Sequence, residues 1–376
     1  MPRLIVHQFD PSTPTPGGID TCIRGLLTYA GPHEDLAVVG VDASGSSTRP
    51  LGVWEEHTFG DNTIRFLPVA RLDAGDQKRR IPHAARLMAG VARHRGKLPR
   101  ATVLQAHRAD TAAAARRILR HDSFVYCIHT QEQGLTGATS DSVWRFASGL
   151  HERMEESTIG ASQRTVVFNE DYARTLSARF PQVRFSSTWF DPALIPAGAE
   201  RDPYNVVWVG RLEGPKDPQL ALNAFEQLVE LDPSNPWSLT MVGSGTLQAD
   251  VAERVRSSAE LRDRVVLIGR LAPAEVMTTA SKAGTFLMTS VAGYEGFPRV
   301  LLEALACGAV AVVTEGADTG KVVHDGKNGY RVGHTADELA KAVLEARSIP
   351  SGPDAARSSV ATYAAPAVVA SILAPG

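Results

Sequence analysis

Two positively charged side chains in a glycine- and proline-containing turn, Arg211 and Lys216, have the types and spacing to carry chemistry. They lie in residues 209–218, directly after an apolar run of strand length, where an α/β sheet places a ligand-binding loop. An arginine can bind a diphosphate through paired hydrogen bonds, and a lysine can add a point charge. Such a pair is more often a solvated loop, so the phosphate interpretation requires a second feature beside it.

The second feature is a helix predicted over residues 299–307. Pro298 suits the first turn, where its missing N–H costs nothing, and Gly308 serves as a stop. The free N–H groups and positive dipole end of such a helix suit a phosphate. Since proline has no N–H, the backbone groups of Arg299 and Val300 are the expected donors.

Two glutamates accompany this helix, Glu295 just before it and Glu303 inside it. A glutamate on a helix is usually solvated. Glu303, however, lies between apolar residues at 301–302 and 304–305. It must therefore tolerate an apolar setting or hold a polar ligand there.

The elements that position these residues form a repeating order of short apolar runs and helical patterns, which indicates βαβ units and parallel sheets. Strands are expected at 4–6, 36–41, 102–105, 124–128, 164–168, 205–209, 238–242, 264–267, 285–288 and 310–313. Helices are expected at 19–29, 84–95, 111–119, 142–159, 219–231, 247–255, 273–283 and 299–307. The predicted fold is α/β, with two Rossmann-like, doubly wound domains facing each other across an active-site cleft.

A chain of 376 residues exceeds the usual size of one domain. The predicted break lies in the proline-containing stretch 189–203, which gives domains over residues 1–191 and 198–354. The alanine-rich tail, residues 355–376, is expected to be helical as far as Pro366 and is a candidate to pack back on the first domain.

Bulk composition excludes several classes of protein. The net charge of −2 implies no polyanionic partner, and the three scattered cysteines fit neither a disulfide framework nor a zinc site. We therefore expect a reducing compartment and a cytoplasmic location. The short apolar run near the start is interpreted as a strand rather than a signal peptide, and no stretch reaches membrane-spanning length.

Four ordered blocks of this sequence resemble the retaining glycosyltransferases of family 4, which have the GT-B fold. The blocks are residues 295–332, residues 209–211 with Lys216, residues 241–247, and residues 16–19. The chain departs from the family pattern at residues 186–191, where a Pro-Asn-Gly block is common, and at Lys321, where an acidic residue is common.

The resemblance implies that the chain moves a sugar from a nucleotide-sugar donor to an unidentified acceptor. Arg211 and Lys216 would neutralise the leaving diphosphate, Glu303 would accept hydrogen bonds from the ribose, and Glu295 would contact the transferred sugar. His129, at the end of the strand 124–128, matches a histidine that the family places beside the sugar, although most histidines are structural. The resemblance implies further donor contacts from Gly17, Gly18, Gly243, Gly296, Phe297, Pro298, Arg299 and Val300.

The expected chemistry needs neither a metal nor a cofactor. The catalytic task is to stabilise developing phosphate charge, and the sequence contains no Asp-x-Asp pair to hold a metal ion. Arg211, Lys216 and a helix N-terminus can replace the metal. Because no further carboxylate in a matched block is available as a base, we expect transfer with retention of anomeric configuration.

Residues 78–120 contain twelve Lys or Arg residues and one acid, Asp110. A solvated basic face is one interpretation. The other is peripheral contact with the inner face of a membrane, or with an anionic or lipid-linked acceptor. No nucleic-acid motif accompanies the charge, so nucleic acid is not an expected partner.

Three other functions stay open at this point. One is a nucleotide-sugar epimerase of the same fold, and another is a non-catalytic sugar-nucleotide binding module. The third is a dinucleotide-dependent oxidoreductase. Its best motif, residues 243–245, is weak because Gln248 stands where a third glycine is needed.

Overall fold

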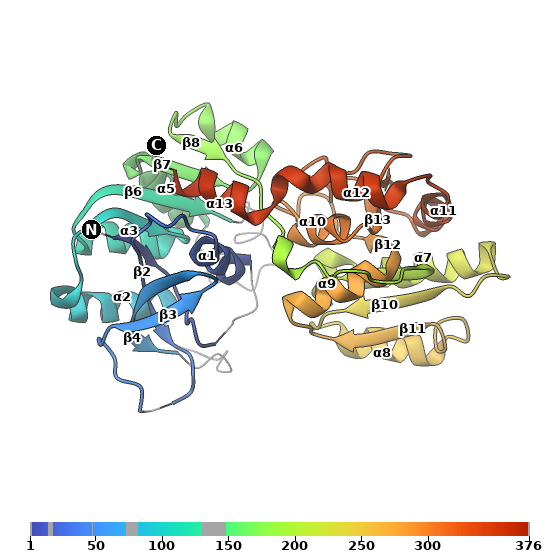
Figure 1. Ribbon diagram of the computed structural model, residues 1–376, viewed down its shortest axis with the longest axis horizontal. Coiled ribbons are helices and arrows are strands. Elements are labelled where there is room, and N and C mark those ends of the chain that lie inside the picture. The colour runs from blue at the N-terminus through green and yellow to red at the C-terminus, as the bar shows by residue number, and fades with distance from the viewer. Residues whose placement is uncertain (1, 14–17, 47, 73–81, 130–147, 375–376) are drawn as a thin grey trace. The chain divides into compact units, whose positions relative to one another are not determined.

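The computed structural model describes residues 2–13, 18–46, 48–72, 82–129 and 148–374. The contacts divide the chain into two units (Figure 1). One contains Met1–Ser186 with Pro366–Gly376, and the other contains Ser187–Ala365. The second unit thus begins at residue 187, although the first domain is expected to extend to residue 191. It also extends to residue 365, although the second domain is expected to end at residue 354.

The first unit contains an eight-stranded sheet in the order β3-β4-β2-β1-β5-β6-β7-β8. All paired strands run parallel except β3 and β4, which form an antiparallel pair. The strands are β1 (Arg3–Val6), β2 (Leu36–Asp42), β3 (Glu55–Phe59), β4 (Asn62–Arg71), β5 (Ala101–Ala106), β6 (His121–Ile128), β7 (Arg164–Val167) and β8 (Val183–Phe185).

Helices cover both faces of this sheet, because alternate residues of each strand point to opposite sides. Leu4 and Val6 pack with one set of helices, and Ile5 packs with helix α1 on the other face. The helices are α1 (Gly18–Thr28) on the Ile5 face and α2 (His83–His94), α3 (Ala109–Ile118), α5 (Ser148–Ala161) and α6 (Glu170–Ser177) on the Leu4 face.

The second unit contains a six-stranded sheet in which every pair is parallel. Its order is β11-β10-β9-β12-β13-β14, which is the 3-2-1-4-5-6 order of a Rossmann fold. The strands are β9 (Asp202–Val209), β10 (Ser238–Val242), β11 (Val265–Gly269), β12 (Ala283–Met288), β13 (Val310–Thr314) and β14 (Gly329–Val332).

Two helical layers enclose this sheet. Val206 and Trp208 face one layer, and Val207 faces the other. The first layer consists of α7 (Pro218–Leu231), α8 (Gln248–Ser257) and α11 (Ala336–Arg347), and the second of α9 (Pro273–Lys282), α10 (Arg299–Ala306) and α12 (Gly352–Val360). Both units are therefore doubly wound, so the predicted α/β class is confirmed. No described helix is long and apolar enough to cross a membrane.

The tail contains a second helix that the sequence does not predict. A helical turn at Ala361–Tyr363 follows α12, and α13 (Ala365–Leu373) then begins with Pro366 in its first turn. The expectation that helix ends at Pro366 is wrong, because proline is tolerated in a first turn. Arg3 and Arg164 of the first unit donate hydrogen bonds of 2.6 and 2.9 Å to the carbonyls of Leu373 and Ser371.

Candidate active site

The switch point of the second sheet lies between β9 and β12, the two strands from which the order runs in opposite directions. Ligands of open α/β sheets bind outside the carboxyl ends of the strands at such a point. The loop after β9 contains Arg211 and Lys216, and the loop after β12 contains Glu295. The topology therefore brings together two segments that are about 80 residues apart in sequence.

Lys216 is held in a tight turn directly before helix α7. Residues Gly214–Lys216 form one 3-10 turn, and Asp217 then adopts a left-handed conformation with φ of 44°. The Asp217 carboxylate caps α7 by accepting a 3.0 Å hydrogen bond from the Leu220 N–H. Pro218 at the first helical position is preorganised for the helix. This turn fixes the backbone conformation from which the Lys216 side chain extends.

Thr289, the residue after β12, ties the two loops together. Its hydroxyl lies 2.8 Å from the carbonyl oxygens of both Lys216 and Asp217. The same oxygen accepts a 3.0 Å hydrogen bond from Nε1 of the buried Trp208 on β9. One buried hydroxyl thus links the turn, its strand and the neighbouring strand.

The ammonium group of Lys216 donates to Oε1 of Glu295 at 2.6 Å. Ser290 donates to the same oxygen at 2.6 Å. The side chains of Lys216 and Glu295 are only 14% and 10% exposed, so their charges compensate each other where water is scarce. Arg211 donates to the Tyr294 hydroxyl, and the Lys216 nitrogen lies 5.7 Å from the Tyr294 ring. The structure therefore brings both predicted cations and Glu295 to one place.

Helix α10 begins at Arg299, with Pro298 as its N-cap. No side chain caps it, and Leu301 donates a 3.2 Å hydrogen bond to the Pro298 carbonyl. Among the described residues, no hydrogen-bond acceptor is found for the N–H groups of Arg299 and Val300, as expected for a first turn. The Arg299 guanidinium lies 5.1 Å from the Trp189 ring. The helix thus offers backbone donors, whereas the Arg299 side chain contacts an aromatic neighbour.

Glu303 lies one turn further along α10. Burial raises the pKa of its carboxyl group to about 7, helped by the nearby Asp191 and opposed by the Arg299 charge. Hydroxyl groups of a ligand that donate hydrogen bonds to this carboxyl group would replace the water lost on burial and so favour its ionised form. Glu303 thus lies in a poorly hydrated position on the helix, and its ribose contact stays a prediction.

The glycine and aromatic residues of the predicted donor set have clear packing roles. Gly243 has φ of 140°, and a Cβ there would lie 1.8 Å from the Gly210 carbonyl oxygen. The carbonyls of Gly296 and Phe297 accept hydrogen bonds of 2.7 and 3.2 Å from threonine hydroxyls. The Phe297 side chain is buried. These packing roles explain why Gly243, Gly296 and Phe297 are present without any contact to a nucleotide-sugar donor.

Sequence reasoning missed Thr289, Ser290 and Tyr294. Thr289 and Ser290 are fully buried hydroxyl residues at the end of an apolar strand. Two adjacent polar residues in that position are a signal for a hydrogen-bonded junction, since buried hydroxyls require partners. Tyr294 carries no comparable signal, because its contact with Arg211 depends on the folded loop.

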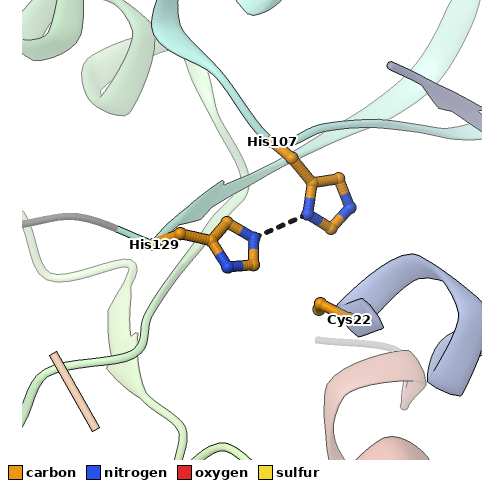
Figure 2. A group of neighbouring side chains, drawn as sticks. All are labelled: Cys22, His107 and His129. Atoms are coloured by element: carbon orange, nitrogen blue, oxygen red, sulfur yellow. Dashed lines mark hydrogen bonds between the residues drawn. The ribbon is translucent and has the colours of Figure 1, made fainter. Parts of the chain in front are cut away.

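The first unit places histidines at the carboxyl ends of three strands. His7 follows β1, His107 follows β5, and His129 follows β6. His129 Nε2 lies 2.8 Å from His107 Nδ1 (Figure 2). The His129 ring also stacks on Phe168 with centroids 4.6 Å apart. The predicted position of His129 at a strand end is confirmed, and its contact with a sugar is untested.

Cys22 of α1 lies beside the two rings (Figure 2), and one ligand atom from each of Cys22, His107 and His129 falls within 4.8 Å of the others. Thiolate and imidazole ligands of this kind suit a borderline metal ion such as zinc. The 2.8 Å hydrogen bond between the rings already satisfies one nitrogen of each, however. Burial lowers the pKa of His107 to about 3, so this ring is neutral with or without a metal ion.

The remaining predicted residues of the first unit are only partly described. Gly17 lies outside the described residues, and Gly18 is the first residue of α1. In the basic segment, residues 78–81 are likewise not described. Helix α2 buries its apolar residues Leu87, Met88 and Val91 in the core, so they are not available for insertion into a lipid bilayer. Membrane contact through the exposed arginines stays a prediction.

The comparisons with known proteins agree with the second unit's architecture. Residues 203–348 match the family model for glycosyl transferases group 1. Glycogen synthase of Mycobacterium tuberculosis is 28% identical over 241 residues, which are 62% of this chain and 56% of the relative. D-inositol 3-phosphate glycosyltransferase of Rhodococcus jostii is 28% identical over 150 residues, 39% of this chain and 33% of the relative. The matched regions thus span about half or less of these relatives.

Two solved structures share the fold over nearly the whole chain. Sucrose-phosphate synthase from Thermosynechococcus elongatus has a TM-score of 0.69 at 17% identity, covering 99% of this chain and 97% of that one. HepE of Anabaena, solved with UDP-glucose, has a TM-score of 0.69 at 16% identity, covering 99% of each chain. The chain therefore has the α/β architecture of the GT-B type, and its residues 203–348 form a group 1 glycosyltransferase domain.

Proposed function

We propose that this chain is a retaining, metal-independent glycosyltransferase that uses a nucleotide-sugar donor. The observation that carries the proposal is the convergence of Arg211, Lys216 and Glu295 at the β9/β12 switch point. Cations at this position can neutralise a diphosphate, and a carboxylate beside them can accept hydrogen bonds from sugar hydroxyls. The N-terminus of α10 adds backbone donors of the kind that bind phosphates.

The donor we propose is a UDP-sugar. The support is indirect: HepE, which shares the fold, is solved with UDP-glucose, and the group 1 domain covers the predicted donor residues of the second unit. In the proposed complex Lys216 exchanges part of its contact with Glu295 for the diphosphate. Glu295 is then free to accept from the sugar, while Glu303 accepts from the ribose hydroxyls.

Metal independence follows in the proposal from the charges that the site already contains. Arg211 and Lys216 supply positive charge where a phosphate would leave, which is the role that a divalent cation plays in other enzymes. The Cys22–His107–His129 group has soft ligands that suit neither magnesium nor manganese. EDTA should therefore leave turnover unchanged.

Retention is proposed because the cation cluster assists departure of the diphosphate from the face that the acceptor attacks. The bond between the anomeric carbon and the phosphate oxygen breaks, and a bond to the acceptor oxygen forms on the same face. The acceptor proton passes to the departing phosphate oxygen, so no separate protein base is required. For the acceptor, an α-glucan and an inositol phosphate are the first chemical classes to test, from the names of the relatives.

The proposal is tested by incubating the protein with radiolabelled UDP-, GDP- and ADP-sugars and each acceptor class, with and without EDTA. We expect labelled product with a UDP-sugar, at equal rates in both conditions. Proton NMR of the early product should show the donor's anomeric configuration. Inversion would overturn the retaining mechanism, and loss of activity in EDTA that added magnesium restores would overturn metal independence.

A nucleotide-sugar epimerase is the alternative with the same fold. The relatives and structures named above are described as a synthase or a glycosyltransferase, or carry a bound UDP-sugar, and none of these descriptions supports an epimerase. The same incubation separates the two activities, because an epimerase changes the sugar without releasing the nucleoside diphosphate.

A further inference from the structure

A directed chain of hydrogen bonds runs through the core of the first unit to His129. Arg3 Nη1 donates to Gln105 Oε1 at 3.0 Å. Gln105 Nε2 lies 2.9 Å from His107 Nε2, and His107 Nδ1 lies 2.8 Å from His129 Nε2. Arg3, Gln105 and His107 are all buried, so water does not compete for these bonds.

The chemistry of the first donor sets the direction of every later bond. A guanidinium group only donates, so the Gln105 oxygen must face Arg3 and the amide NH₂ must face His107. An amide NH₂ also only donates, so His107 Nε2 accepts and carries no proton. The proton of the neutral His107 ring is therefore on Nδ1, which donates to His129 Nε2.

We propose that Gln105 and His107 are positioning residues that hold His129 as its neutral Nδ1–H tautomer, which makes His129 a hydrogen-bond donor to a substrate oxygen. The donor role rests on the proposed function, whereas the tautomer follows from the hydrogen bonds alone. Nε2 of His129 accepts from His107, so Nδ1 is the nitrogen that carries the proton. Figure 2 shows this second nitrogen on the side of the His129 ring away from His107.

The surroundings keep this arrangement neutral. Burial lowers the pKa of His107 to about 3 and the pKa of His7 well below its usual value, and the two rings lie 6.1 Å apart. Arg108, whose charge further disfavours protonation of His7, forms a 2.8 Å ion pair with Asp110. A neutral His107 donates one proton only, which the geometry directs to His129.

The consequence for catalysis is specific. A His129 ring with its proton on Nδ1 can donate to a hydroxyl or to a developing negative charge through that atom. It cannot act as a general base there, because the lone pair of the neutral ring is on Nε2 and faces His107. This role agrees with a retaining reaction that needs no protein base.

The tautomer can be read directly by long-range ¹H–¹⁵N correlation of protein labelled at the histidine nitrogens. The His129 signals are assigned by their loss in His129→Gln. We expect the Nδ1–H pattern in the wild type, although an unconstrained imidazole side chain favours Nε2–H. Gln105→Met should release the constraint and give a mixture. His107→Asn, whose amide NH₂ can occupy the position of Nδ1, should keep the Nδ1–H pattern better than His107→Phe.

Turnover provides the second readout. Gln105→Met and His107→Phe should lower kcat/KM about tenfold, the effect of weakening one hydrogen bond, and His107→Asn should restore part of it. If His129 is Nε2–H in the wild type, or Gln105→Met leaves the tautomer unchanged, the inference is overturned. Stoichiometric binding of Zn²⁺ that is lost in Cys22→Ser, His107→Phe and His129→Gln would overturn it as well, by showing a metal centre.

The NMR measurement needs no turnover, so the two proposals can fail separately. A protein that transfers no sugar but shows the expected tautomers contradicts the proposed function and supports the positioning role of Gln105 and His107. An active, retaining enzyme with Nε2–H on His129 supports the proposed function and contradicts the positioning role.

Discussion

The two units both contain a doubly wound sheet, but the side chains at the carboxyl ends of their strands differ: they are charged in the second unit and include a neutral histidine in the first. In the second unit the loops after β9 and β12 carry charges, with Lys216 and Glu295 paired at 2.6 Å. In the first unit the ends of β5 and β6 carry His107 and His129, and burial keeps the His107 ring neutral. Both units thus present loops at the carboxyl ends of their strands, and the side chains in these loops determine what each unit can bind.

The difference has a physical reason. A phosphate needs preorganised positive charge, and this charge is stable in a poorly hydrated loop only if a carboxylate compensates it before the ligand arrives. Sugar hydroxyls need directed donors and acceptors, which neutral groups provide without a compensating ion. We therefore expect the second unit to respond strongly to charge removal and the first unit to respond mainly to changes in hydrogen-bond direction.

The largest effect should come from removing the cations of the second unit. Lys216→Ala and Arg211→Ala should each lower turnover about a hundredfold, because one preorganised charge at a developing anion contributes on the order of 3 kcal/mol. Initial rates with a UDP-sugar donor measure this effect. Lys216→Ala should also lower the unfolding temperature, because Glu295 loses its partner in a buried setting.

Lys341→Ala is the matched control, because Lys341 forms an exposed ion pair with Asp337 on α11. It should change neither turnover nor unfolding temperature appreciably. Near-normal turnover in both Lys216→Ala and Arg211→Ala would contradict the proposal that these residues bind the donor diphosphate.

A smaller, pH-dependent effect should come from Glu303. Its folded pKa of about 7 exceeds its ordinary value of 4.5, so the folded state binds more protons between these pH values. The Glu303 contribution to the free energy of unfolding should therefore fall as the pH rises from 4.5 to 7 and level off above that, while the buried His7 and His107, whose pKa values are lowered, contribute in the opposite direction. Affinity for UDP should rise over the same window, because the ionised carboxylate accepts ribose hydrogen bonds better. Urea unfolding and calorimetric titration measure the two trends.

Glu303→Gln should remove this contribution, so the difference between wild type and variant isolates it, and should weaken UDP binding at pH 8 by roughly 1.5–3 kcal/mol. Glu295→Gln is the informative contrast, since it should spare bare UDP and weaken binding of the intact sugar donor. Wild-type affinities for UDP and donor in both variants would show that the two glutamates do not have these roles.

The sequence predicts most buried strands, because their apolar runs are visible without knowledge of the fold. The expected strand 238–242 coincides with β10. Strands β3 and β4 are not predicted, since β3 is a polar, partly exposed edge strand and β4 is interrupted by Arg65 and Pro68. Propensity and periodicity do not detect strands whose stability comes from pairing with a neighbour.

The site could be predicted only in part. Loop position and residue type indicate Arg211, Lys216 and Glu295, because each follows a strand whose end is predicted. The ion pair between Lys216 and Glu295 is not visible, since it joins residues 79 apart. The chain from Gln105 to His129 is hidden for the same reason: it depends on parallel pairing of β5 with β6, which no local pattern encodes.

A third effect, on stability, should come from Thr289. Thr289→Val removes the hydroxyl that accepts from Trp208 Nε1 and contacts the carbonyls of Lys216 and Asp217. A buried indole N–H without an acceptor costs about 1–3 kcal/mol, so the free energy of unfolding should fall by that amount. Thr289→Ser keeps the hydroxyl and should lose less. Equal losses in both variants would show that packing of the methyl group, rather than the hydroxyl, matters.

The smallest effect should come from Asp217→Gly, in which two consequences of one residue oppose each other. Asp217 has φ of 44°, a conformation that glycine adopts without steric cost. Its carboxylate also caps α7 through the Leu220 N–H, but glycine at an N-cap costs only a few tenths of a kcal/mol relative to aspartate. The net change in the free energy of unfolding should therefore be within about 0.5 kcal/mol.

Asp217→Ala keeps the strain and loses the cap, so it should cost about 1–2 kcal/mol. Urea unfolding of both variants tests this difference. If glycine is as harmful as alanine, the carboxylate contributes more than a cap, and its approach to His334 at 3.5 Å is the next contact to remove.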